Sequence, residues 1–404
     1  ANFVYDTAAT ADVTYEADPE KGGRVTNPSD KVQVITADGL EGSTAEPANG
    51  YKFVGWFKDN EQTAFSTNVN LTKEEAREKL NRDQSNGTYM ATRFTAKFEV
   101  DETMTTTVTY ESSDETMGTV YPESETIQIV TAAGLNGSVA SPKQGYKFTG
   151  WYKGTELVSE DEMLTVAEAK PKLNQNGDET YRNTTFVARF SYDDKAQATI
   201  SYQSQNENWG TAAPGEETIQ IVPGNPNVTV IGSTATPKAG YKFDGWYKGD
   251  SLVCSDKVLT SEEVKVNLNT DPVNNTYTDT TFEARFSLDE TAKATATYRT
   301  ADRTMGRVYP ISSDFQIVDA QGLVGSTARP RNGYRFVGWY KGDDTTTPIS
   351  TDAALTAELA KENLNKNQDN GTYTDTVFTA RFEIDPTQTV KVYYKPESQE
   401  MGSV

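Results

Sequence analysis

The stretch GYKFVGWFK at Gly50–Lys58 decides the fold, because the chain contains it four times. It returns as GYKFTGWYK, GYKFDGWYK and GYRFVGWYK, beginning at Gly145, Gly240 and Gly333. The tryptophans inside these copies are spaced by 95, 95 and 93 residues. A repeat of this length is large enough for a core of its own, so the sequence predicts a tandem array of small domains.

Two further motifs keep the same phase as the aromatic stretch. GSTAEP precedes it and returns as GSVASP, GSTATP and GSTARP, whereas ATRFTAKF follows it and returns as NTTFVARF, DTTFEARF and DTVFTARF. The repeats are therefore placed at residues 8–103, 104–195, 196–291 and 292–387. Residues 1–7 resemble the end of a preceding repeat, and residues 388–404 resemble the start of a further one. The junctions are short and charged, which predicts limited swing between neighbours and an elongated, monomeric beads-on-a-string rod.

Each repeat is predicted to be mainly β, with an α+β character only through one short helix. In the aromatic strand, Tyr51 and Phe53 share one face, and strict alternation would turn Trp56 outward. A β-bulge at Gly55 would return Trp56 to the core. Asn49-Gly50 precedes this strand and predicts a type I′ hairpin turn, because both residue types accept positive φ.

The single helix of each repeat is expected before its last strand, within Leu71–Asn81 in the first copy. Thr72 and Glu75 have the spacing of a capping box, in which each residue satisfies a free backbone N–H of the other. The fourth repeat has Thr356 without a matching acid. Pro171 falls late in the helix of the second repeat and should shorten it, because proline lacks a backbone donor.

Composition excludes several classes of function for this 404-residue chain. It has 38 Lys and Arg against 59 Asp and Glu, giving a net charge of −21, with no His and one Cys. Nucleic-acid phosphates would repel such a chain. The lack of histidine removes His-based triads and most catalytic zinc sites. No apolar run is long enough for membrane insertion. We therefore expect no enzyme, no cofactor, no nucleic-acid partner and no membrane span.

The order V-x-Y, GS-x-A-x-P, GY-x-F-x-GW and TF-x-A-x-F resembles the divergent internalin-type B repeats of Gram-positive and gut bacterial cell-surface proteins. The resemblance covers nearly the whole chain and transfers no catalytic residue to it. It implies an extracellular adhesin, attached to the cell wall through a part of the protein outside this chain. The repeats would then form a stalk that projects or contributes host-binding surface. The alternative is a dedicated binding module for a host protein, such as immunoglobulin, or for mucin or another glycan.

The candidate partner-binding residues differ between repeats or are expected at the surface. The fourth repeat carries a charge of −1, against −6, −6 and −7 in the others, and arginines around its aromatic strand account for the difference. A tryptophan replaces the methionine of other repeats in the opening turn of the third. An aromatic residue follows each core tryptophan with outward parity. The candidates are Arg329, Arg331, Arg335, Trp209, Tyr152, Tyr247 and Tyr340. Drift at solvent-facing positions, and filling of the methionine pocket by Trp209, are the competing interpretations.

Three other sites are weaker candidates. Lys58 and Asn81 recur in every repeat, but no acid recurs beside them to promote an isopeptide bond. The acids Asp101 and Glu160–Glu162 lack the spacing of a calcium loop, so a solvated surface is the simpler interpretation. Cys254 replaces a serine of the second repeat and has no base in the sequence nearby, which favours a tolerated substitution.

Overall fold

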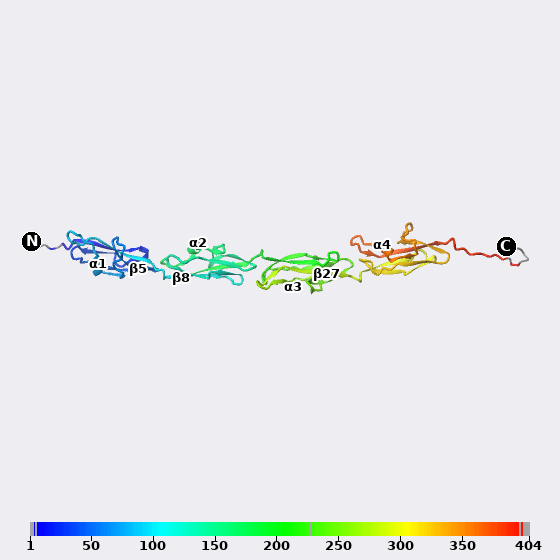
Figure 1. The fold of residues 1–404 in the computed structure, drawn as a ribbon, viewed down its shortest axis with the longest axis horizontal. Helices are drawn as coiled ribbons and strands as arrows, with labels where there is room; N and C mark the ends of the chain where they lie inside the picture. Colours follow the sequence, from blue (N-terminus) through cyan, green and yellow to red (C-terminus); the bar gives the residue numbers. More distant parts are fainter. Residues whose placement is uncertain (1–3, 5, 227, 396, 399–404) are drawn as a thin grey trace. The chain divides into compact units, whose positions relative to one another are not determined.

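The computed structural model describes residues 4, 6–226, 228–395 and 397–398, and it is mainly β (Figure 1). The chain forms two compact units, Ala1–Ala196 and Gln197–Val404, each containing two of the predicted repeats. The mainly-β class with a short helix before each last strand is confirmed. Residues 389–395 form no strand, and most of the predicted flanking fragment 1–7, together with 399–404, lies outside the described residues.

The first repeat contains two sheets and one helix. Its larger sheet has the order β3-β1-β7-β5 and its smaller sheet the order β2-β4-β6. The opening strand β1 pairs in parallel with the closing strand β7, so the rest of the repeat forms the crossover between them. The elements are β1 Thr10–Asp18, η1 Glu20–Gly22, β2 Gly23–Val25, β3 Ser29–Gln33, β4 Gly42–Pro47, β5 Tyr51–Lys58, β6 Asn70–Thr72, α1 Lys73–Lys79 and β7 Thr92–Val100.

The second repeat adds an edge strand to the larger sheet, which has the order β10-β8-β17-β12-β13, and a two-stranded ladder β15-β16. Its smaller sheet has the order β14-β11-β9. The elements are β8 Thr105–Ser112, β9 Gly118–Tyr121, β10 Ser124–Gln128, β11 Ser138–Pro142, β12 Tyr146–Lys153, β13 Glu156–Ser159, β14 Met163–Leu164, α2 Val166–Ala169, η2 Lys170–Lys172, β15 Asn174–Gln175, β16 Tyr181–Arg182 and β17 Thr184–Tyr192.

The larger sheet of the third repeat has the order β20-β18-β27-β22-β23 and keeps the edge strand of the second. The larger sheet of the fourth has the order β30-β28-β36-β32 and lacks that edge strand, as in the first. The elements of the third are β18 Gln197–Ser204, β19 Gly210–Ala213, β20 Glu216–Gln220, β21 Ser233–Pro237, β22 Tyr241–Lys248, β23 Ser251–Cys254, β24 Val258–Leu259, α3 Ser261–Val266, β25 Asn269–Asp271, β26 Thr276–Thr278 and β27 Thr280–Leu288. Those of the fourth are β28 Lys293–Thr300, β29 Gly306–Tyr309, β30 Ser312–Gln316, β31 Ser326–Pro330, β32 Tyr334–Lys341, β33 Ala354–Leu355, α4 Ala357–Glu362, β34 Asn365–Lys366, β35 Tyr373–Thr374 and β36 Thr376–Ile384.

The core of each repeat is centred on its tryptophan. In the first repeat, Trp56 is 0% exposed and meets the Tyr15 ring edge-on at 6.1 Å. The register between β5 and β7 shifts between Phe53 and Gly55, which confirms the predicted bulge and explains why Trp56 points inward. The same shift occurs in the other repeats, whose tryptophans are also fully buried. One bulge therefore sets the core of every copy.

The prediction of a type I′ hairpin at Asn49-Gly50 was wrong. Gly50 has a φ of +82°, but Asn49 does not have positive φ, and the Tyr51 N–H donates to the Ala48 carbonyl at 3.0 Å. These features define a type II turn, in which only the third residue needs positive φ. The physical reason is that β4 and β5 belong to different sheets. The turn connects two layers, so it does not have to match the twist of a paired hairpin.

The helix predictions are confirmed. Thr72 caps α1 and forms the reciprocal capping box with Glu75. Thr356 caps α4 without a reciprocal acid, as expected from Leu359. In the second repeat α2 has only 4 residues and continues as a 3-10 turn that contains Pro171. Capping and proline chemistry act within one turn of chain, and for that reason they can be predicted without knowledge of the sheet.

In the first and third repeats, the turn glycine before the aromatic strand also makes room for a neighbouring loop. Within the first unit, a Cβ placed on Gly50 would lie 2.4 Å from Val130 Cγ2 of the second repeat. Within the second unit, a Cβ on Gly240 would lie 2.3 Å from Val318 Cγ2 of the fourth repeat. Glycine is therefore required there for two reasons, positive φ and close approach.

Candidate functional site

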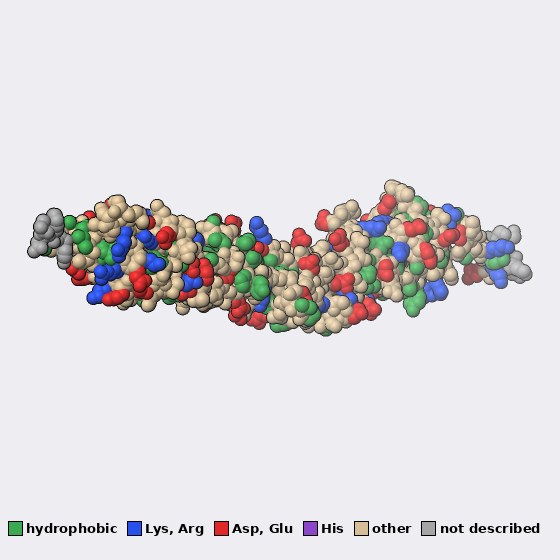
Figure 2. All heavy atoms as spheres, turned by 60° about the vertical axis from the view of Figure 1, so that its left-hand side comes forward, with side chains coloured by type: hydrophobic (Ala, Val, Ile, Leu, Met, Phe, Trp, Pro, Cys, Tyr) green, Lys and Arg blue, Asp and Glu red, His purple; other side chains and the backbone are tan. Residues whose placement is uncertain are grey.

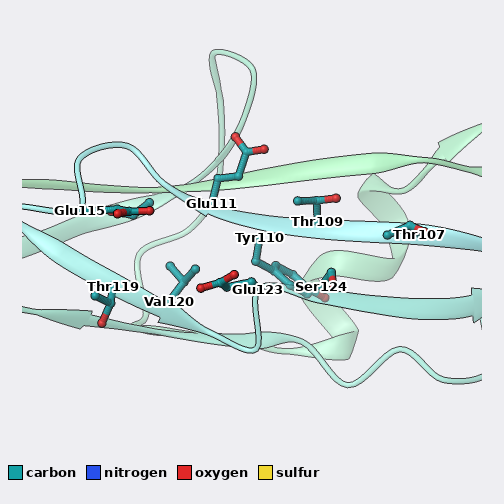
Figure 3. Close-up of a pocket in the computed structure, with 10 residues that line it drawn as sticks. Thr107, Thr109, Tyr110, Glu111, Glu115, Thr119, Val120, Glu123 and Ser124 are labelled. Atoms are coloured by element: carbon teal, nitrogen blue, oxygen red, sulfur yellow. The ribbon is translucent and has the colours of Figure 1, made fainter.

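A groove lies beside the opening strand of the second repeat, where β8 turns into β9 (Figure 3). Its volume is about 720 Å³. Glu111 and Glu115 extend from the end of β8 and the following turn, and Glu123 from the turn after β9. Figure 3 shows Glu123 between the two strands and Glu111 on the other side of β8. The lining therefore includes three carboxylates, of which Glu123 lies between the strands, and it suits a cationic or hydroxyl-rich group.

The same groove recurs in the third and fourth repeats, with volumes of about 480 Å³ and about 460 Å³. Each copy is built on the buried tyrosine of the opening strand, which pairs in register with a phenylalanine of the closing strand. These tyrosines are Tyr110, Tyr202 and Tyr298. Because the strand register is identical, the lining positions can be compared one by one between repeats.

The lining of the groove changes its charge between repeats. The position of Glu111 is Gln203 in the third repeat and Arg299 in the fourth. The positions of Glu115 and Thr119 likewise become arginine in the fourth repeat. That groove is lined by Thr297, Tyr298, Arg299, Thr300, Arg303, Gly306, Arg307, Val308, Ile311 and Arg331. Four of these are arginines and none is acidic, so the fourth-repeat groove has the opposite charge to the second.

The structure brings together two of the three arginines that the sequence singled out. Arg331 lines the fourth-repeat groove, and Arg329 lies on β31 directly opposite Arg307 of β29. Arg335 lies on β32 and forms an ion pair with Glu383 of β36. Arg335 is therefore engaged within the larger sheet and does not line the groove.

Three further arginines of the fourth repeat, Arg299, Arg303 and Arg307, were not predicted from the sequence. They precede the quoted aromatic strand by more than two dozen residues, and only strand register places them beside Arg329 and Arg331. The signal that could have revealed them is the comparison of opening turns, in which ADRTMGRV of the fourth repeat replaces SDETMGTV of the second. Arg299 also donates to Thr379 Oγ1 and pairs with Asp343.

The expectation that the aromatic after each core tryptophan is exposed at the surface was wrong for the first and fourth repeats. Tyr340 is only 6% exposed and Phe57 is also buried, whereas Tyr152 and Tyr247 are half-buried. A cation of the closing strand covers each ring, as Arg189 does for Tyr152 at 4.0 Å and Arg285 for Tyr247 at 4.3 Å. Neither Phe57 nor Tyr340 belongs to the core cluster of its tryptophan, so the predicted parity holds. The covering cation, Lys97 or Arg381, lies over the ring and removes the expected exposure.

Trp209 lies half-buried in the opening turn of the third repeat. Its ring stacks on Tyr241 with centroids 5.7 Å apart and an interplanar angle of 18°. Met117 and Met305 hold the equivalent turn position and pack against their own cores. The geometry therefore matches the interpretation that Trp209 fills the methionine position, with one face remaining at the surface.

The remaining candidates have simple surroundings. Lys153 donates to the Lys172 carbonyl and Lys248 to the Asn267 carbonyl, so both ammonium groups bind backbone near the helix end. Burial raises the pKa of the Cys254 thiol, which keeps it protonated at neutral pH. Among the described residues, no group of three or more potential ligands is placed to hold a metal ion. No described helix has the length and apolar character needed to cross a bilayer.

A buried polar contact beneath the groove was not predicted. In the first repeat the Tyr15 hydroxyl donates to Asp30 at 2.8 Å, and Asp30 also accepts from the Gly42 N–H at 3.1 Å. The second and third repeats use Glu125 and Glu217 in the same way. In the fourth repeat Tyr298 donates instead to the Val324 carbonyl. In the first three repeats, this contact fixes the glycine of the GS motif against the opening strand.

Alkaline pH should destabilise the fourth repeat through Tyr298. Burial raises the pKa of Tyr298 to about 12, against roughly 10 in an unfolded chain. The contribution of Tyr298 to the free energy of unfolding is fully present below pH 10. It falls by roughly 1.4 kcal/mol per pH unit between these two pKa values, because the tyrosine loses its proton first in the unfolded state. Urea unfolding at pH 8 and 11.5 should show that Tyr298→Phe removes part of this loss. Tyr309→Phe is the matched control, because Tyr309 is 77% exposed; an equal effect of both variants would contradict the assignment.

Comparison with known families identifies the repeats. The divergent InlB B-repeat domain matches residues 13–111, 202–290 and 297–384, and the Listeria-Bacteroides repeat domain matches residues 107–170. No curated protein matches the chain significantly. Repeats of these types are typical of bacterial surface proteins and usually occur in their extracellular parts. Because the first match covers more than half of the chain, the chain belongs to the divergent InlB B-repeat family.

Proposed function

We propose that this chain is a non-enzymatic repeat region of a bacterial surface adhesin, serving as an extended stalk that also contributes host-binding surface. The observation that carries the proposal is the contrast between core and groove. The buried Trp–Tyr contact is kept at 5.9 to 6.1 Å in all four repeats. The groove above it changes from acidic to basic. A constant scaffold with a variable surface suits display and spacing better than catalysis.

The location follows from the family. Its repeats usually occur in extracellular proteins, and attachment to the cell wall would come from another part of the protein. The abundance of carboxylates, which are spread over the visible face in Figure 2, would keep such a chain soluble outside the cell and away from anionic surfaces.

The stalk is tested by small-angle X-ray scattering of the whole chain. Four domains of this size in a row span about 130 Å, which corresponds to a radius of gyration of about 38 Å for a monomeric rod. A single compact globule of 404 residues would instead give about 22 Å. We expect a value near the first figure, independent of protein concentration. A value near the second, or a dimer, would contradict the stalk.

A second candidate function is a dedicated binding module for immunoglobulin or mucin. The arginines of the fourth repeat favour it, because arginine is enriched at interfaces. Surface plasmon resonance with purified immunoglobulin and with intestinal mucin would test this directly. Binding that survives enzymatic deglycosylation of the partner would indicate protein recognition, whereas loss of binding would indicate glycan recognition. Failure with both partners leaves the stalk proposal intact and removes these two ligands.

A further inference from the structure

We propose that the fourth-repeat groove binds an acidic polysaccharide, whose sulfate or carboxylate groups are held by Arg303, Arg307, Arg329 and Arg331. This inference rests on the proposed adhesin function and names the class of ligand that its surface takes. It concerns one repeat, so it makes a prediction that the stalk alone does not make.

Arg307 and Arg329 form a cross-strand pair of like charges. These residues lie directly opposite each other on β29 and β31. Like charges in this position destabilise a sheet. In the first repeat the equivalent residues are Arg24 and Glu46, which form an ion pair at 2.6 Å. The other repeats have neutral pairs at this position, Thr119–Ser141 and Thr211–Thr236. The fold therefore does not require two arginines, and an anion placed between them would remove their repulsion.

The positive charges of the groove arginines are not neutralised by acids of the chain. In the part of the chain that the structure describes, Arg303, Arg307, Arg329 and Arg331 form no ion pair. Asp302, the nearest acid in sequence, accepts instead from the backbone and hydroxyl of Thr304. The chain has a net charge of −21, so carboxylates are plentiful elsewhere. Four arginines without an ion-pair partner therefore lie together, and an anion from outside the chain could neutralise them.

The groove arginines indicate the chemistry of the ligand. A guanidinium group offers planar, paired N–H donors that match the oxygens of carboxylate and sulfate. The groove is about 460 Å³, within the size range of small-ligand sites. Its lining includes Ile311, which is 68% exposed, and Tyr309 lies on the same outward face as Arg307. Two residues along a strand span roughly 7 Å. A sugar ring against Tyr309 would therefore place its acidic substituent near Arg307.

Single-stranded nucleic acid fits less well. Binding of successive bases uses several aromatic rings along a basic track. Tyr309 is the exposed ring beside this groove within the described residues, and the grooves of the second and third repeats carry acids instead of arginines. A short acidic oligosaccharide would contact the fourth repeat alone, so the acidic surfaces of the other repeats would not repel it.

The test uses the whole chain and isothermal titration calorimetry. The probes are a heparin hexasaccharide, a polygalacturonate oligomer, inorganic polyphosphate and single-stranded DNA, each at low and moderate salt. We expect one site for at least one of the two glycans, with affinity that falls as salt rises. The double variant Arg307→Thr, Arg329→Thr copies the neutral pair of the third repeat and should weaken binding at least tenfold. Its melting temperature should be unchanged or higher, because the repulsive pair is gone.

Two controls make the result specific to the groove. Arg24→Thr removes the arginine at the same position in the first repeat, where Glu46 neutralises it, and should change affinity less than twofold. Arg335→Thr removes an arginine of the fourth repeat outside the groove and should also change affinity less than twofold. Conversely, Glu207→Arg, Thr211→Arg and Thr236→Arg, introduced together in the third repeat, should create a second site.

Several results would overturn the proposal. These are no binding of either glycan, unchanged affinity in the double variant, an equal loss in the Arg24→Thr control, or tighter binding of polyphosphate or DNA than of the glycans. If the double variant fails to fold, Arg303→Ala in the exposed turn replaces it, with the same expected direction. A rod-like radius of gyration combined with no glycan binding would reject this inference while leaving the stalk in place.

Discussion

Replacement of Trp151 by alanine should destabilise the second repeat by about 3–5 kcal/mol, the range for removal of a large buried aromatic side chain. Trp151 is 0% exposed and meets Tyr110 edge-on at 5.9 Å. Its indole N–H donates to the Glu162 carbonyl at 3.0 Å. The variant would leave a cavity that the packed core cannot easily fill. The Glu162 carbonyl would lose the indole donor but keep the Ala140 N–H, which lies at 2.9 Å.

Urea unfolding and limited proteolysis with mapping of the cleavage sites would measure the effect of Trp151→Ala. Cleavage should increase within residues 104–195 and stay unchanged within Gln197–Val404, because each repeat has its own core. Trp209→Ala is the control, since Trp209 is half-buried and should cost about 1 kcal/mol. A small effect of Trp151→Ala, or cleavage spread over the whole chain, would show that the cores are not independent.

Replacement of Gly137 by alanine should cost about 3 kcal/mol although it adds one methyl group. Gly137 has a φ of +95°, and a Cβ there would lie 1.9 Å from the Leu164 carbonyl oxygen. The backbone must therefore both accept a strained conformation and move, and each strained position costs about 1–3 kcal/mol. The equivalent glycines Gly42, Gly232 and Gly325 have the same contact, at 2.1, 2.0 and 1.8 Å.

Gly154→Ala is the matched control for this substitution. Gly154 also has positive φ, at +61°, but a Cβ there would have nothing within 4 Å. It should cost only about 1 kcal/mol, the penalty for the left-handed conformation alone. Thermal unfolding of both variants measures the difference, and equal losses would mean that the GS motif is not conserved among the repeats for steric reasons.

The features that could be predicted from the sequence depend on neighbouring residues. The capping box of Thr72 and Glu75 and the shortening at Pro171 act within one helical turn. The bulge at Gly55 could also be predicted, because burial of Trp56 conflicts with strand alternation in any other register. In each case local geometry admits one solution, and the structure has it.

The features that could not be predicted depend on which strands meet. The Asn49-Gly50 turn looked like a hairpin, but β4 and β5 pair with other strands in separate sheets. Tyr340 looked exposed because its parity is opposite to that of Trp339, and the sequence does not show that Arg381 covers its ring. The groove was missed because Arg307 and Arg329 become neighbours only through the pairing of β29 with β31.

The repeats together show how one fold can carry different surfaces. The tyrosine, tryptophan and glycine positions are held by packing, hydrogen bonds and backbone conformation, so they cannot vary freely. The groove positions project from strand ends and turns, where substitutions have small effects on stability. Charge reversal between the second and fourth repeats is therefore available without a change of fold.

Hydrogen–deuterium exchange of the whole chain, with and without the heparin hexasaccharide, tests most directly whether the repeats share one core but carry grooves of different chemistry. We predict slower exchange with ligand in β28, β29 and β31 of the fourth repeat, which carry the groove arginines and Arg329. The equivalent strands β8, β9, β18 and β19 should exchange at the same rate with and without ligand. Equal protection in every repeat, or protection confined to the acidic groove of the second, would contradict the assignment of different chemistries to one recurring groove.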